Sequence, residues 1–142
     1  MAAITQGQPL VTIKLLPTLV HFECIGEQSY EHTIIRFNKM YASLKACNIW
    51  DVLIEGKTSK RLSVLDSYNA IKYIQEELGR DGSKLRIAFL DERSTGFEHN
   101  VFAENVASNR GLCLRFFRDR QNALCWLRKT PVSQLPSESH QV

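Results

Sequence analysis

Hydrophobic positions alternate with polar ones at the start of the chain and then change to a helical period. Residues 10–16 and 19–25 alternate as strands do, and the break at Pro17 is short enough for a hairpin. Apolar residues then recur at steps of three and four, at Tyr30, Ile34, Phe37, Tyr41 and Leu44. The pattern predicts an antiparallel strand pair followed by a helix over about residues 30–47.

The rest of the chain alternates between predicted strands and helices. Strands are predicted over residues 49–56, 85–91 and 112–117. The second of these is nearly all apolar, as strands covered on both faces of a parallel sheet are. Helices are predicted over residues 63–78, about 97–109, and 120–129. The order favours an α/β fold: one mostly parallel sheet, an antiparallel N-terminal strand, and helices on the faces.

Side-chain positions follow from the same patterns. Ser29, Ser63, Thr95 and Asp119 precede the four helices as N-caps, and Asp66 and Glu98 complete two capping boxes. The helix after Ser63 is expected to turn Leu65, Ile71, Ile74 and Leu78 inward. The third helix is expected to bury Phe102, Ala103, Val106 and Ala107.

The length of 142 residues suits one domain. We expect an N-terminal arm over residues 1–9, the domain over 10–130, and a disordered tail over 131–142. The tail contains two prolines and three serines and little to bury. No apolar run reaches the roughly 20 residues of a membrane span, and the N-terminus lacks the features of a secretory signal. A cytoplasmic protein is the expectation.

The composition and the motifs of the chain argue against several classes of function. A formal charge of +3 is too small to indicate specific nucleic-acid binding. Cys24, Cys47, Cys113 and Cys125 form no C-x-x-C pair, so buried free thiols are expected in place of a metal site. His99 is expected to be solvated and His21 to be packed or hydrogen-bonded. Nucleophile, phosphate-loop and dinucleotide motifs are missing, so we expect no catalytic residues, no cofactor and no enzyme activity.

Four segments in the C-terminal half resemble a known group. They are "LRIAFLD" (85–91), "FEHNVFAENVASNRG" (97–111), "LCLRFF" (112–117) and "RQNALCWLRK" (120–129). Together with the opening hairpin they resemble the SpoIIAA-like family, small bacterial proteins related in fold to STAS domains and to CRAL-TRIO lipid-binding domains. The resemblance covers residues 8–130 and implies a STAS-like fold with a regulatory role.

The stretch "SVLDSYNAIKYIQEEL" (63–78) holds the candidate switch residues. In partner-switching STAS proteins, a phosphorylatable serine follows an aspartate at the start of the second helix, and Asp66–Ser67 stands at a similar place. Tyr68 and Asn69 depart from the small residue and glycine of that pattern. The alternative is that Ser63 caps the helix, Asp66 completes the capping box, and Ser67 has no regulatory role.

Two further features are candidates for binding. Arg115, Arg118, Arg120 and Arg128 could form a basic patch if the last strand is a sheet edge, or a solvated face. Phe97, Tyr68 and Tyr73 could line a cleft at the carboxyl ends of the strands, with loops 57–64 and 91–96 as its rim.

These observations favour a regulatory or scaffolding domain that docks a protein partner not identified by the sequence. Docking would involve the start of the second helix, with phosphorylation at Ser67 or Ser63 as a gate. The alternative function is binding of a small apolar or lipid-like ligand between helices and sheet. A homodimer through the edge strand or a helix face is compatible with so small a sheet.

Overall fold

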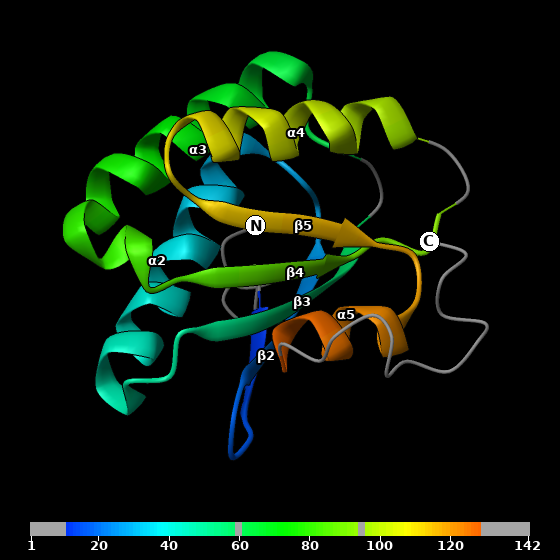
Figure 1. Ribbon diagram of the computed structural model, residues 1–142. Helices are drawn as coiled ribbons and strands as arrows, with labels where there is room; N and C mark the ends of the chain where they lie inside the picture. The colour runs from blue at the N-terminus through cyan, green and yellow to red at the C-terminus, as the bar shows by residue number, and fades with distance from the viewer. Residues whose placement is uncertain (1–10, 59–60, 94–95, 129–142) are drawn as a thin grey trace, which may run out of the picture.

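The computed structural model describes residues 11–58, 61–93 and 96–128. They include a five-stranded sheet in the order β1-β2-β3-β4-β5 (Figure 1). The strands are β1 (Val11–Leu15), β2 (Val20–Gly26), β3 (Asp51–Thr58), β4 (Arg86–Leu90) and β5 (Cys113–Phe117). β1 pairs antiparallel with β2, and the other neighbours pair parallel. The predicted fold class is confirmed, and β5 is an edge strand. The predicted arm (1–9) and tail (131–142) lie outside the described residues.

The helices cover the two faces of the sheet unequally. They are α2 (Tyr30–Cys47), α3 (Val64–Leu78), α4 (Phe97–Asn109) and α5 (Arg120–Leu127), and a short 3-10 helix, η1 (Gly79–Ser83), follows α3. α2, α3 and α4 lie side by side on one face, and α5 lies on the other (Figure 1). No helix among the described residues is long and apolar enough to cross a membrane.

Alternation along the central strands divides the core between these faces. Val52 and Ile54 of β3 pack with Phe22 and Leu44 on the side of α2, whereas Leu53 packs on the side of α5. On β4, Ile87 packs on the first side, and Ala88 and Leu90 pack on the second. Both faces of these strands are therefore buried, as the apolar run over 85–91 predicts.

The prediction that Leu65 faces inward is wrong, because this side chain is 67% exposed. The buried stripe of α3 consists of Ser67, Ala70, Ile71 and Leu78. At about 100° per residue, Leu65 is turned roughly 200° away from Ser67 and so points to solvent. Ser67, a polar residue, occupies the inward position instead.

Three smaller predictions also need correction. Cys113 is exposed, because α5 is short and packs against the far end of β5, where the Phe117 and Trp126 rings lie 5.6 Å apart. The N-cap of α4 is Gly96, and the predicted cap residue Thr95 lies outside the described residues. Phe102 and Val106 are half-buried, whereas Ala103 and Ala107 are buried as predicted.

Candidate functional site

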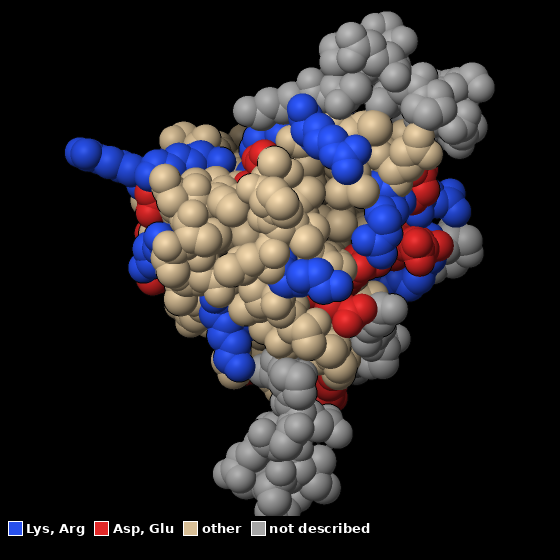
Figure 2. Space-filling view, turned by 90° about the horizontal axis from the view of Figure 1, so that it is seen from below, with Lys and Arg blue, Asp and Glu red and all other residues tan. Residues whose placement is uncertain are grey.

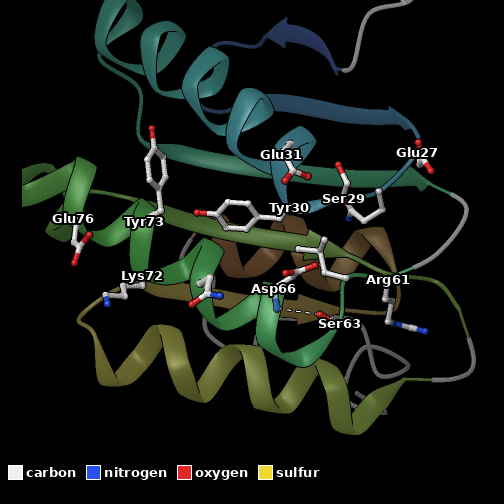
Figure 3. Close-up of a pocket in the computed structure, with 13 residues that line it drawn as sticks. Glu27, Ser29, Tyr30, Glu31, Arg61, Ser63, Asp66, Lys72, Tyr73 and Glu76 are labelled. Atoms are coloured by element: carbon white, nitrogen blue, oxygen red, sulfur yellow. Dashed lines mark hydrogen bonds between the residues drawn. The ribbon is translucent and has the colours of Figure 1, made fainter.

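An open groove of about 910 Å³ lies between the first turn of α2 and one side of α3, from its N-cap Ser63 to Glu76 (Figure 3). Tyr30 and Glu31 of α2 face Asp66 and Tyr73 of α3 across it (Figure 3). Its described lining residues are Glu27, Gln28, Ser29, Tyr30, Glu31, Arg61, Leu62, Ser63, Asp66, Asn69, Lys72, Tyr73 and Glu76. Two helix starts thus border the same surface, and two of the predicted site residues lie on it.

Both helices begin at a serine N-cap. The Ser29 hydroxyl accepts a hydrogen bond from the His32 backbone N–H at 3.0 Å. The Ser63 hydroxyl accepts one from the Asp66 backbone N–H at 3.1 Å. The predicted caps are confirmed. The N-caps of both helices therefore lie on the lining of the groove.

We expect Ser63→Ala to lower the free energy of unfolding by about 1 kcal/mol, because the cap bond to the Asp66 N–H is lost. Urea unfolding followed by circular dichroism measures this difference. The exposed Ser108→Ala in α4 serves as the control and should change the free energy by less than about 0.5 kcal/mol. Equal stability of Ser63→Ala and the natural protein would show that this cap contributes nothing.

The groove carries an excess of negative charge. Among its described lining residues, Glu27, Glu31, Asp66 and Glu76 are acidic and Arg61 and Lys72 are basic. The difference is two negative charges. The groove is thus polar, open and electrostatically suited to a cationic partner.

The two candidate serines lie in different surroundings. Ser63 is exposed at the rim of the groove. Ser67 is only 8% exposed, and its Oγ lies 3.2 Å from Nε2 of His99 on α4. Ser67 is four residues beyond the cap and sits on the inward stripe of α3, so it faces α4 and the sheet. A kinase can reach Ser63 on the folded surface, whereas Ser67 becomes accessible only if α3 and α4 separate.

His99 departs from the prediction of a solvated side chain. It is half-buried and contacts Ser67 across the α3–α4 packing. The two residues are 32 positions apart, and no spacing in the sequence indicates the contact. In the described part of the chain, no hydrogen bond orients the second ring nitrogen of His99. A nucleophile–base pair needs such an orienting group, so the contact alone does not make a catalytic pair.

A buried carboxylate at the end of β4 organises the loops beside this contact. The Asp91 side chain is 3% exposed. It accepts hydrogen bonds from Arg61 Nη2 (3.0 Å), Asn100 Nδ2 (3.0 Å), and the backbone N–H (3.1 Å), Nε (2.8 Å) and Nη2 (3.3 Å) of Arg93. Burial alone would raise the pKa of Asp91, but the bonds from Arg93, Asn100 and Arg61 outweigh it and lower the pKa well below its usual value. Asp91 is therefore an anion that joins three segments.

The rim of the predicted cleft includes these loops, but its aromatic lining differs from the prediction. Arg61, Leu62, Asp91 and Arg93 border an opening at the carboxyl ends of β3 and β4. Phe97 is 74% exposed and lies outside that lining, as does Tyr68. Tyr73 lines the groove between α2 and α3 instead.

A glycine makes room for Arg61 in this loop. Gly96 has φ +85°, a conformation that other residues rarely adopt. A Cβ atom at this position would collide with the Arg61 guanidinium. Gly96 thus permits both the turn into α4 and the approach of Arg61 to Asp91.

The four arginines of the predicted basic patch are all exposed. Arg120 forms a 2.6 Å ion pair with Glu55, whose other oxygen lies 2.6 Å from His21 Nε2. Burial tends to raise the pKa of Glu55, but the hydrogen bonds from Arg120 and His21 lower it overall. Arg115 lies over the Phe117 ring at 5.8 Å. On the face in Figure 2, Lys and Arg side chains are scattered, some separated by uncharged surface and others beside acidic side chains.

The described residues include no cluster of metal-ligating side chains. Within residues 11–58, 61–93 and 96–128, no three His, Cys, Asp or Glu side chains converge as a metal site requires. Burial raises the pKa of the Cys24 thiol, and the charge of Arg36 opposes this only in part. The thiol is consequently a poor nucleophile and a poor metal ligand.

Known proteins were compared with the chain by sequence and by structure. No protein-family model matches the chain, and no curated protein sequence matches it. Among solved structures, the chain is similar to an uncharacterised protein of the DUF3478 family with a SpoIIAA-like fold, from Shewanella loihica PV-4. The two are 18% identical, with 82% of this chain and 91% of that chain covered and a TM-score of 0.49. The description of that protein names the fold that the sequence patterns resemble.

Proposed function

We propose that this protein is a non-enzymatic regulatory or scaffolding domain that docks a protein partner in the groove between α2 and α3. The observation that carries the proposal is the acidic surface on which two helix starts and the exposed Ser63 meet. The partner offers a basic segment, and Glu31 and Glu76 on opposite walls contact it. Docking takes place in the cytoplasm.

Two half-buried tyrosines of the groove and an exposed leucine beside it supply the rest of the contact. Leu65 projects from α3 one residue before Asp66 and is largely exposed. Tyr30 and Tyr73 line the groove itself. Protein interfaces combine an apolar or aromatic centre with a charged rim, and the charges set orientation and association rate. The groove has this composition on a small scale.

Phosphorylation at Ser63 is the proposed gate. A phosphate adds about two negative charges and would lie at the start of α3, where the helix dipole favours it. The charge of the groove would then change from a difference of two negative charges to about four. A basic partner is bound more tightly in that state. The gate is assigned to Ser63 because Ser67 is buried against His99.

Mapping of phosphate on protein purified from its own cells tests the gate. We expect a modified fraction with phosphate on Ser63, detected by intact mass and localised by digestion, and no phosphate on Ser67. Phosphate on Ser67 alone would contradict the assignment and would require α3 and α4 to open. Reversal of the charges of Glu31 and Glu76 tests docking itself.

A second candidate function is the binding of a small apolar ligand. It is favoured by one separate observation, an apolar cavity of about 170 Å³ between the sheet and α2 and α3. Ligand binding there and partner docking in the groove do not exclude each other.

A further inference from the structure

The cavity has the size and lining of a small-molecule site. Phe22, Met40, Ile71 and Ile87 are buried side chains on its walls. An apolar cavity of roughly 150 Å³ stays dry and accepts a molecule of the size of benzene. The 170 Å³ here therefore suits one aromatic ring or a chain of about six carbons. The acyl chains of a membrane lipid are too long for it.

One end of the cavity is polar. A second space of about 130 Å³ opens at the carboxyl ends of β3 and β4 and shares Leu62, Ser67 and Phe89 with the first. Ser67 and Thr33 line both spaces, so their hydroxyls lie at the boundary between the apolar and the polar part. Beyond it, His99 and Asn100 line the opening.

The charge around this opening favours an anion. Among its described lining residues, Arg61 and Arg93 are cationic and Asp91 is anionic, an excess of one positive charge. The Asp91 oxygens are turned to their hydrogen-bond donors and are nearly excluded from solvent. Ser67 Oγ and His99 Nε2 lie 3.2 Å apart and can both reach one ligand oxygen at the opening.

We propose that the cavity binds a small carboxylic acid, with its ring or short chain among the apolar walls and its carboxylate at Ser67 and His99. This inference rests on the second candidate function and names its ligand class and orientation. A carboxylate offers an acceptor oxygen to the Ser67 hydroxyl and a negative charge to the nearby guanidinium groups, which also bind Asp91. The apolar part contributes through burial in a site that is already formed.

Isothermal titration of the full chain with three probes of the same ring tests this inference. The probes are phenylacetate, the neutral benzyl alcohol and the cationic benzylamine. We expect phenylacetate to bind about tenfold or more tightly than the alcohol, because a hydrogen bond to a charged group is stronger than one to a neutral group. Benzylamine should bind most weakly of the three.

Substitutions locate the site and its orientation. Ser67→Ala and His99→Ala should each weaken phenylacetate binding about tenfold and leave benzyl alcohol binding nearly unchanged. Ser63→Ala, in the groove, is the matched control and should bind phenylacetate as the natural protein does. Circular dichroism of each variant establishes that it is folded.

Three results would overturn the inference: no heat with any probe, equal affinity for the acid and the alcohol, or full phenylacetate affinity in both folded variants. None of these results bears on partner docking, which is measured with variants of Glu31 and Glu76, because these two residues line neither the cavity nor its opening. Failure of the ligand site is therefore distinguishable from failure of the docking proposal.

Discussion

Asp91→Ala should lower the free energy of unfolding by about 3 kcal/mol, the largest stability effect expected for a polar residue of the site. The substitution removes an anion that is 3% exposed and leaves the Arg61 and Arg93 guanidinium groups without their shared acceptor. Loss of one partner of a buried ion pair costs about 3–5 kcal/mol. We take the lower end because the Arg93 side chain is 42% exposed and partly screened by water.

Chemical denaturation in urea measures this effect, and the neighbouring Glu92→Ala is the control. Glu92 is exposed and should change the free energy of unfolding by less than about 0.5 kcal/mol. A loss below about 1 kcal/mol for Asp91→Ala would contradict the view that this carboxylate joins the loops after β3 and β4 to α4.

The Asp91 carboxylate also makes the stability of the folded protein depend on pH. The pKa of Asp91 is lowered in the folded protein, whereas in the unfolded chain it lies near 3.9. A group with a depressed folded pKa stabilises the fold fully above its unfolded pKa, and this contribution fades as the pH falls towards the folded pKa. The advantage of the natural protein over Asp91→Asn should thus be constant near neutral pH and shrink below about pH 4.

Local signals in the sequence predicted much of the fold and one half of the candidate site. Strand alternation and the three-and-four spacing of apolar residues predicted the five strands and the four α-helices of the described residues, because these periods reflect which face is buried. The cap at Ser63 was predictable because its hydrogen bond to the Asp66 N–H spans only three residues. The same spacing, counted back from Ile71 by four, reaches Ser67 and not Leu65, so the wrong assignment came from preferring the apolar residue for the buried face.

The other half of the site depends on contacts between distant segments. Ser67 contacts His99 only because α3 packs against α4. Asp91 accepts a hydrogen bond from Arg61, which lies in a loop 30 residues earlier. One signal was present in the sequence, an aspartate that ends a nearly all-apolar strand at residues 85–91. Such a residue lies at the carboxyl edge of the sheet, where α/β proteins place their sites. The groove itself arises from the spacing of α2 and α3, which no single segment encodes.

Reversal of two charges in the groove should reduce partner binding about tenfold or more. Glu31→Lys with Glu76→Lys changes the charge of the described lining residues from two negative to two positive. A basic partner would then meet like charges on both walls, which slows association and weakens the complex. Both residues are exposed, and a lysine at Glu31 in the first turn of α2 opposes the helix dipole, so the free energy of unfolding should fall by no more than about 1 kcal/mol.

Glu77→Lys provides the matched control. Glu77 is also exposed on α3 and adjoins Glu76 in the sequence, but it lies outside the groove lining. It therefore changes the net charge of the protein without changing the charge of the groove. A loss of binding that Glu77→Lys shares with the double variant would be due to the net charge of the protein and not to the charge of the groove.

The most direct test of the docking proposal is quantitative affinity capture from the protein's own cells with three baits: the natural chain, Glu77→Lys, and Glu31→Lys/Glu76→Lys. We predict a protein with a basic segment that the first two baits retain equally and the double variant loses about tenfold or more. Capture of the same proteins at equal levels by all three folded baits would contradict the proposal that the groove between α2 and α3 is the docking site.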